Sequence, residues 1–215
     1  LKTDRCIHSM EYRWLDLKKM PIWIHCKGYL VRDDNMKPLY MIGCINEIGE
    51  RQKADNVSGL LGESGFREYM NQLDTPLETG YLLRIGIDHF KEINDNFGQE
   101  YGDFVLKKSA ECISGCISEG QKVYKLVADE FLILDVSSDK AQDADKLYDK
   151  VRETIDRFIE TNEFKVIYTV SGGIVPFAAL KGNQYAEALK LTDFALNEAK
   201  KLGRNRCYIF NGETY

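Results

Sequence analysis

The chain has 215 residues, 44% hydrophobic and 29% charged, which is the composition of an ordinary globular protein with room for one or two domains. Its formal net charge of -5 argues against a nucleic-acid-binding protein, because contacts to the phosphate backbone need clustered Lys and Arg. No apolar stretch approaches the ~20 residues of a transmembrane helix, so we expect membrane contact only through parts outside this chain.

The cysteine pattern excludes a disulfide framework and the common zinc motifs. The six cysteines form no C-x-x-C, and the three histidines are not grouped with them at zinc spacing. We therefore expect reduced thiols in a cytosolic setting. Cys112 and Cys116 lie one helical turn apart, which suits either a metal or an apolar core, and the apolar neighbours favour the core. The chain starts at Leu1 without a signal peptide, so we expect a fragment of a longer protein.

The first part of the chain is strand-like. Aromatic and β-branched residues fill 21–31 and 38–45, and the polar cluster 32–37 separates them, which predicts an antiparallel hairpin. An earlier strand is expected at 11–17. Three strands without a second layer make a poor core, so an incomplete domain is predicted.

A polar segment follows at 46–56, and apart from Gly49 it is compatible with a helix. We expect a short helical connector. A solvated linker is the alternative, because so few residues do not establish a coiled coil.

After Asn56, segments of helical and strand character alternate. Predicted helices cover 65–73, 89–97, 101–117, 140–161 and 183–202, and predicted strands cover 81–87, 122–127, 131–136, 164–175 and 206–210. This order predicts an α/β (α+β) domain with a mixed central sheet flanked by helices. The last helix carries a candidate buried stripe of Ala188, Leu191, Ala195 and Ala199.

Three segments carry a family resemblance: "GIDHFKEINDNFGQEYGDFVL", "VADEF" and "TDFALNEAKKLGRNR". In order and spacing they resemble the GGDEF family, the diguanylate cyclase domains, over about residues 55–211. The opening "DNVSGLLGESGF" is similar to the family's first motif, although Gly62 and Glu63 depart from it. The resemblance implies the nucleotidyl-cyclase-like mixed sheet. Upstream, residues 11–55 resemble the C-terminal strands and exit segment of a PAS sensor domain.

The resemblance also implies a chemistry. In the family, two GTP molecules on two facing domains condense to cyclic di-GMP and pyrophosphate. Such phosphoryl transfer needs Mg²⁺ held by carboxylates, because hard cations prefer oxygen ligands and neutralise the developing charge.

The nucleotide-binding positions of the family are retained. Asn94 and Asp103 stand where the family reads guanine, since an amide and a carboxylate match its hydrogen-bonding edge. The positions implied for phosphate contacts are Lys200, Arg204 and the backbone amides near His89, Phe90 and Lys91. Each residue alone also fits an ordinary polar or basic helix position, but together and in register they favour nucleotide binding.

The metal-binding positions are only partly retained. Asp129 and the carbonyl of Ile87 match family ligands, but Gly86 replaces the first metal-binding Asp. Asp88, on the same strand face, could substitute; its offset of about 7 Å favours a role as helix N-cap instead. The resemblance implies Asp129, Glu130 and Lys91 as catalytic residues.

The signature hairpin and the regulatory site have also changed. Val127 and Ala128 replace the two glycines, and we expect the β-branched Val127 to fit the turn less well than Ala128. An inhibitory R-x-x-D site is absent, since residues 118–121 read "SEGQ".

These observations predict PAS strands at 1–48, a helical linker at 49–56 and a GGDEF domain at 57–215. We expect a bacterial cytoplasmic signalling protein, a homodimer through the PAS and linker parts, that binds GTP or a related guanine nucleotide with Mg²⁺ while cyclase activity is lost or weak. The alternatives are an active diguanylate cyclase with an altered metal site and an interaction module that binds no nucleotide.

Overall fold

The computed structural model describes residues 7–15, 21–47, 54–73, 79–136, 141–162, 164–181 and 184–212. The chain forms two compact units, residues 1–54 and 55–215. Most of the predicted connector, residues 48–53, lies outside the described residues. No helix among the described residues is long and apolar enough to cross a bilayer.

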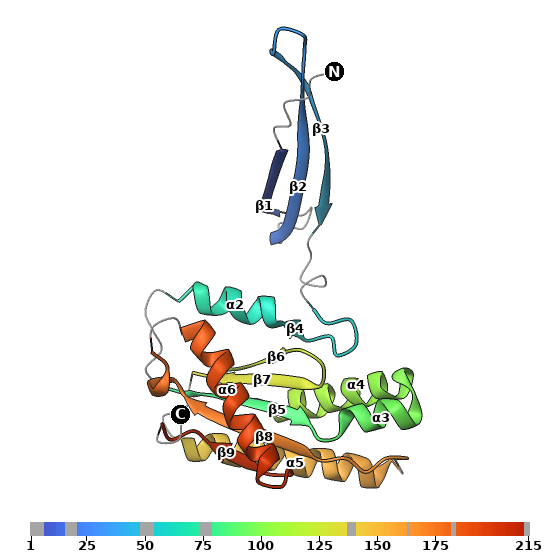
Figure 1. The fold of residues 1–215 in the computed structure, drawn as a ribbon, viewed down its shortest axis with the longest axis vertical. Helices are drawn as coiled ribbons and strands as arrows, with labels where there is room; N and C mark the ends of the chain where they lie inside the picture. Colours follow the sequence, from blue (N-terminus) through green and yellow to red (C-terminus); the bar gives the residue numbers. More distant parts are fainter. Residues whose placement is uncertain are drawn as a thin grey trace. The chain divides into compact units, whose positions relative to one another are not determined.

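The first unit is an antiparallel sheet in the order β1-β2-β3, made by Ile7–Leu15, Pro21–Arg32 and Pro38–Glu47 (Figure 1). Its predicted hairpin is present, and the turn depends on Asp33, whose Oδ1 accepts the N–H groups of Asn35 and Lys37 at 2.9 Å each. Several apolar side chains of β3, among them Met41, Ile42 and Ile45, are exposed.

The second unit is a six-stranded mixed sheet in the order β4-β6-β7-β5-β8-β9. The strands are β4 Leu61–Gly62, β5 Tyr81–Ile87, β6 Gln121–Lys125, β7 Glu130–Asp135, β8 Val170–Pro176 and β9 Cys207–Ile209. Central β5 is antiparallel to both β7 and β8, whereas the outer β4–β6 and β8–β9 pairs are parallel. The predicted mixed sheet flanked by helices is confirmed.

Helices cover both faces of this sheet. On one face, α3 (Phe90–Phe97), α4 (Gln99–Cys116) and α5 (Ala141–Thr161) enclose one apolar cluster. On the other, α2 (Glu63–Asn71) and α6 (Gln184–Lys201) enclose a second. Figure 1 shows α6 crossing β5 and β8. The predicted stripe of α6 is buried, and it lies so close to the sheet that a Cβ on Gly173 would be 2.3 Å from the Leu196 nitrogen.

Helix α5 is amphipathic, with Leu147, Val151 and Ile155 in the core and ion pairs such as Lys146–Asp143 on its outer side.

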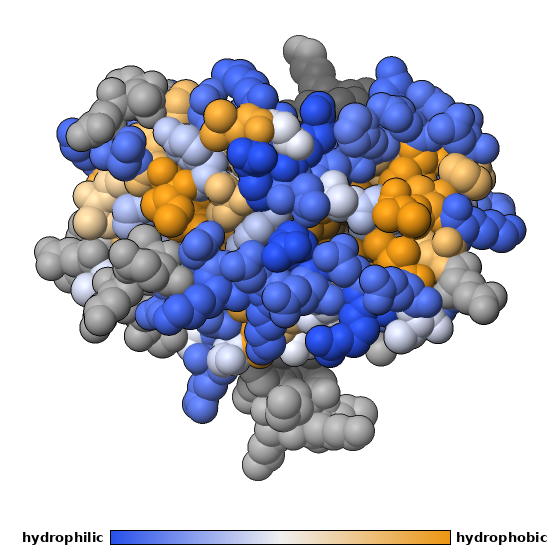
Figure 2. Space-filling model, turned by 90° about the horizontal axis from the view of Figure 1, so that it is seen from below, coloured by the Kyte–Doolittle hydropathy of each residue, from blue (hydrophilic) through white to orange (hydrophobic). Residues whose placement is uncertain are grey.

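Figure 2 shows a mainly hydrophilic surface, with separate smaller apolar areas. The buried Cys116 and half-buried Cys112 belong to the α3–α5 cluster, as the core interpretation predicts.

One predicted strand is shorter than expected. Residues 164–169 are irregular, and β8 begins only at Val170. Phe164 instead stacks on Phe104 with ring centroids 5.4 Å apart, and Tyr168 is buried against the helices. The alternating apolar residues therefore serve helix packing, without a neighbouring strand to pair with.

Candidate functional site

The candidate site is built around one set of directly paired residues in the central sheet. Gly86 of β5 stands opposite Glu130 of β7 and opposite Ser171 of β8. Directly opposed residues share a sheet face, so a side chain at position 86 would project beside Glu130 and toward α6. A Cβ at Gly86 would lie 3.1 Å from Lys200 Nζ and 3.2 Å from Leu196 Cδ2. The end of Lys200 thus borders the space where the family has a metal-binding carboxylate.

Glu130 is paired with Arg84 and, more loosely, with Lys200. Its Oε2 accepts hydrogen bonds from Arg84 Nε at 2.7 Å and from Arg84 Nη2, while Lys200 Nζ lies 3.8 Å from Oε1. Arg84 also donates to the Leu189 carbonyl at 3.1 Å and lies 3.3 Å from Asp193 of α6. Both oxygens of Glu130 therefore face a positive charge, and the network joins β5, β7 and α6.

Asp129 lies beside this network. Burial raises the pKa of its carboxyl group and so does nearby Glu130, while the positive charges of Lys200 and Lys125 act in the opposite direction. The Ile87 N–H donates to the Asp129 carbonyl at 3.3 Å, which ties the hairpin to the end of β5. The structure thus places Asp129 next to Ile87, the two residues predicted to hold a metal.

The signature hairpin keeps a turn that favours glycine at one position only. Ala128 has φ +52°, in the left-handed region, whereas Val127 has a negative φ and is 65% exposed. The expectation that Val127 is the worse replacement is therefore wrong, because the strain falls on Ala128. Buried Lys125 supports the turn, with its ammonium group donating to the carbonyls of Leu126, at 2.9 Å, and Ala128.

Asp88 has a structural role. Its buried carboxylate accepts hydrogen bonds from Thr169 Oγ1 and Ser171 Oγ, both at 2.7 Å, and from the Asn205 N–H at 3.2 Å. It does not cap α3: the N-cap is His89, with φ +57° and no side-chain cap hydrogen bond. The N-cap interpretation of Asp88 is wrong, because this carboxylate instead joins the end of β5 to β8 and to the turn after α6.

The two predicted guanine-reading residues lie on adjacent helices, α3 and α4. Gly102, the neighbour of Asp103, packs so closely on Asn94 that a Cβ there would be 1.8 Å from Asn94 Oδ1. That oxygen is buried without a hydrogen-bond partner among the described residues. Asp103 Oδ1 accepts only a long bond of 3.3 Å from Gln99 Nε2. The structure therefore places Asn94 and Asp103 on two helices that pack closely at Gly102, with the Asn94 oxygen unpartnered among the described residues.

The remaining predicted residues flank these groups. His89 and Lys91 are exposed at the start of α3, Phe90 is buried beneath them, and His89 Nδ1 lies 2.7 Å from Glu92 Oε1. Arg204 is exposed, with φ +61°, in the turn that follows α6. No hydrogen bond or ion pair between described residues joins Asn94 or Asp103 to the Glu130 network.

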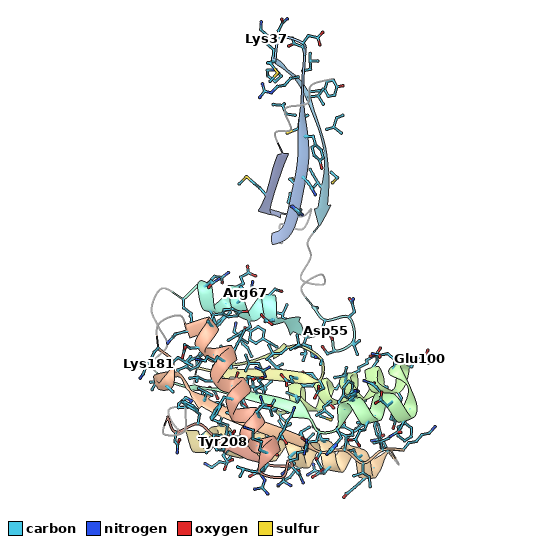
Figure 3. The ribbon with its side chains drawn as sticks, viewed as in Figure 1. Lys37, Asp55, Arg67, Glu100, Lys181 and Tyr208 are labelled. Atoms are coloured by element: carbon cyan, nitrogen blue, oxygen red, sulfur yellow. The ribbon has the colours of Figure 1, made fainter. Side chains whose placement is uncertain are left out.

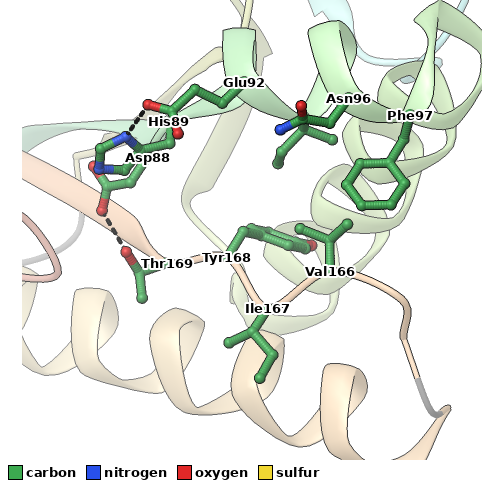
Figure 4. A pocket seen from close by; sticks show the side chains of 10 residues that line it. Asp88, His89, Glu92, Asn96, Phe97, Val166, Ile167, Tyr168 and Thr169 are labelled. Carbon is green, nitrogen blue, oxygen red and sulfur yellow. Dashed lines mark hydrogen bonds and ion pairs between the residues drawn. The ribbon is translucent and has the colours of Figure 1, made fainter.

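A pocket of about 320 Å³ lies along α3 and the residues before it, facing residues 166–169 (Figure 4). Asp88 and His89 are the predicted site residues that line it. Its other walls include Glu92, Phe97 and Ile167, and no Lys or Arg is among the described residues that line it. This pocket is therefore poorly suited to a polyphosphate.

The arrangement does not fit the two-metal site of the family. Position 86 lacks a carboxylate, Glu130 is bound by Arg84 and Lys200, and Asp88 is bound by three donors. Among the described residues no three His, Cys, Asp or Glu side chains are grouped as a metal site. Asp129 and the Ile87 carbonyl are the two matching ligands that are left, so a Mg²⁺ ion here would have to complete its octahedral oxygen shell with water and substrate phosphates.

Sequence reasoning missed Arg84, Lys125 and the donors to Asp88. Arg84 is the one charged residue in the buried strand "YLLRIGI", and a buried charge needs a partner. A lone charged residue in an apolar strand could therefore have identified Arg84 from the sequence. The identity of its partner could not be read locally, since Glu130 is 46 residues away.

Comparison with known proteins identifies the family of the second unit. Residues 53–206 match the family described as "Diguanylate cyclase, GGDEF domain". The diguanylate cyclase VdcA of Vibrio cholerae is 28% identical over 189 residues, which are 85% of this chain and 55% of that protein. The probable diguanylate cyclase DgcT of Escherichia coli is 31% identical over 67% of this chain and 32% of its own length. The cyclic di-GMP phosphodiesterase NbdA of Pseudomonas aeruginosa is 29% identical over 73% of this chain and 20% of its own length. The chain thus spans between about a fifth and just over half of these relatives.

Solved structures show the same fold. The GGDEF domain of DgcB from Caulobacter crescentus, in complex with c-di-GMP, superposes with a TM-score of 0.62 at 23% identity, covering 73% of this chain and 95% of that one. The active GGEEF domain of a Vibrio cholerae diguanylate cyclase gives a TM-score of 0.52 at 27% identity, covering 70% and 91%. Since the family match covers most of the chain and solved GGDEF domains share its fold, this chain belongs to the GGDEF domain family.

Proposed function

We propose that this chain is a regulatory guanine-nucleotide-binding domain of bacterial cyclic di-GMP signalling, with diguanylate cyclase activity lost or weak. The observation that carries the proposal is the environment of Gly86 in the central sheet. The family's metal-binding carboxylate is absent there, and the end of Lys200 borders its space beside Glu130.

Two features support nucleotide binding. The buried, unpartnered Asn94 Oδ1 is an unsatisfied polar atom, which costs about 1–3 kcal/mol and is explained if the amide group reorients to bind a ligand. Asp103 follows Gly102, the residue that packs on Asn94, so an amide and a carboxylate come from neighbouring helices for the edge of guanine. Arg204, exposed after α6, and Lys200 supply positive charge for phosphates.

Two features support weak catalysis. In-line phosphoryl transfer depends on cations and carboxylates held in place, and a displacement of about 1 Å can cost on the order of 100-fold in rate. Here one carboxylate is missing and Glu130 is bound by Arg84. The methyl group of Ala128 adds bulk at a left-handed turn position that the family fills with glycine.

A second candidate is an active diguanylate cyclase, which converts two GTP into cyclic di-GMP and two pyrophosphate with Asp129, Glu130, Lys91 or Asp88 in altered roles. The names of VdcA and DgcT favour it. The three donors bound to Asp88 argue against that residue as a replacement ligand.

We propose that the first unit is the C-terminal part of a PAS sensor domain, joined to the second unit by a helical linker. We also propose that the protein forms a homodimer through these parts. Its proposed location is the bacterial cytoplasm, where GTP is present and thiols stay reduced. The antiparallel three-stranded sheet of the first unit and the exposed apolar residues on β3 support the proposal.

Titration calorimetry with GTP tests the proposed function. We expect saturable binding by the intact chain, weakened about tenfold or more by Asn94→Ala, since a good hydrogen-bonding pair to a base contributes roughly 1–3 kcal/mol. Asn96→Ala on the same helix is the matched control, because Asn96 is exposed and the substitution removes the same group. Absence of GTP binding by the folded chain would refute the proposal and leave the interaction module.

A further inference from the structure

The charges around the signature hairpin are balanced by the chain itself. The two acids of the hairpin, Asp129 and Glu130, face three cations from three different elements: Arg84 of β5, Lys125 of β6 and Lys200 of α6. Arg84 and Lys125 are buried, so their charges are fixed parts of the core.

Arg84 takes over the neutralisation of Glu130. Its guanidinium binds Oε2 through two nitrogens, and it is anchored in turn by the Leu189 carbonyl and by Asp193. Because the Arg84 guanidinium is paired with Glu130, this carboxylate has a cationic partner without a metal ion. A nucleotide phosphate near the hairpin would also meet less repulsion from this carboxylate.

Lys200 is placed to serve the ligand. Its ammonium group fills the volume next to Gly86, and at 3.8 Å from Glu130 it forms only a long ion pair. The side chain is 25% exposed, so it can turn to a phosphate oxygen while Arg84 keeps Glu130 satisfied. A divalent cation in the same space would be repelled by the neighbouring ammonium and guanidinium groups.

We propose that Arg84 and Lys200 together replace the divalent cations of the family site, so that this domain binds the polyphosphate of a guanine nucleotide without Mg²⁺. The identity of the ligand rests on the proposed function. The independence from metal rests on the residues around Gly86.

The test is calorimetric titration of the intact chain with GTP, once in EDTA and once in excess Mg²⁺. The expected dissociation constants agree within about twofold, because Arg84 and Lys200 supply the positive charge that the metal ions of the family site would supply. Binding that requires Mg²⁺, or weakens about tenfold or more in EDTA, would overturn the inference and leave the proposed function standing. Binding in neither buffer would overturn both.

Variants separate a ligand role for Lys200 from a structural one. Lys200→Gln is expected to weaken GTP binding in EDTA by about tenfold, since it removes a charge-assisted phosphate contact. Lys201→Gln is the matched control, because Lys201 is 71% exposed and pairs with Glu198. Equal affinities for the two variants would count against the proposal.

A metal readout without nucleotide completes the test. Mn²⁺ added to the chain alone is expected to keep its free-ion paramagnetic resonance signal. Gly86→Asp, which restores a carboxylate at the position opposite Glu130, is expected to reduce that signal. Loss of the signal with the unaltered chain would contradict the inference.

Discussion

Replacing Arg84 by Met tests whether the guanidinium holds the centre of the domain together. Met keeps much of the apolar stem and removes only the charged group. In the structure the Arg84 and Glu130 side chains are 8% and 16% exposed, so the Arg84→Met substitution would leave a largely buried carboxylate with Lys200 at 3.8 Å as its nearest cation.

The expected loss follows from this burial. Breaking a buried ion pair from one side costs about 3–5 kcal/mol, and because Lys200 stays nearby we expect the lower end, about 3 kcal/mol. For a domain of this size such a loss lowers Tm by about 6–12 °C. Chemical denaturation followed by circular dichroism measures the free energy of unfolding directly.

A double-mutant cycle with Glu130→Gln separates the pair from other losses. The double variant removes both charges, so we expect a coupling energy of about 1.5 kcal/mol or more between the two positions. Arg67→Met is the control, since Arg67 lies on the outer side of α2 (Figure 3) and its pair with Glu63 is 57% and 36% exposed. That change is expected to cost much less than the loss at Arg84, because solvent screens an exposed pair. A loss below about 1 kcal/mol at Arg84, or additive effects in the cycle, would refute the reasoning.

Three further predictions concern other parts of the domain. Ala128→Gly is expected to stabilise the fold by about 0.5–1 kcal/mol because it relieves a left-handed backbone, whereas Val127→Gly should destabilise it by a similar amount; denaturant midpoints check both, and the reverse order would be contradictory. Burial raises the pKa of the Cys112 thiol to about 11, so its alkylation should be slow near neutral pH and accelerate as pH rises toward that value, while exposed Cys44 reacts first; mass spectrometry of labelled peptides checks this, and early labelling of Cys112 would contradict it. Asp88→Asn is expected to cost about 1–3 kcal/mol, because an amide NH₂ would face one of three hydrogen-bond donors; an unchanged free energy of unfolding would show that the network is dispensable.

The order of helices and strands and the mixed sheet could be predicted from the sequence, because the spacing of apolar residues and the turn residues depend on neighbouring positions in the chain. The site could not be predicted in the same way, because it depends on how distant strands pair. The placement of Gly86 opposite Glu130 follows from pairing between β5 and β7, and nothing local in either strand specifies it.

The two errors at the site have the same origin. Asp88 precedes a helix, which favours a cap, yet Thr169 and Ser171 reach it from a strand more than 80 residues away. The strain at the hairpin depends on which residue takes the positive φ, and the backbone of the turn assigns it to Ala128 rather than Val127. Side-chain type alone carries no such information.

The most direct test of the central claim is one incubation of the purified chain with GTP and Mg²⁺, with binding measured by calorimetry and cyclic di-GMP measured by chromatography. The account predicts saturable GTP binding with turnover far below the roughly 1 s⁻¹ of an ordinary enzyme. Synthesis of cyclic di-GMP at about 1 s⁻¹ or faster would contradict it, because a working metal site would then exist despite Gly86 and the bound Glu130.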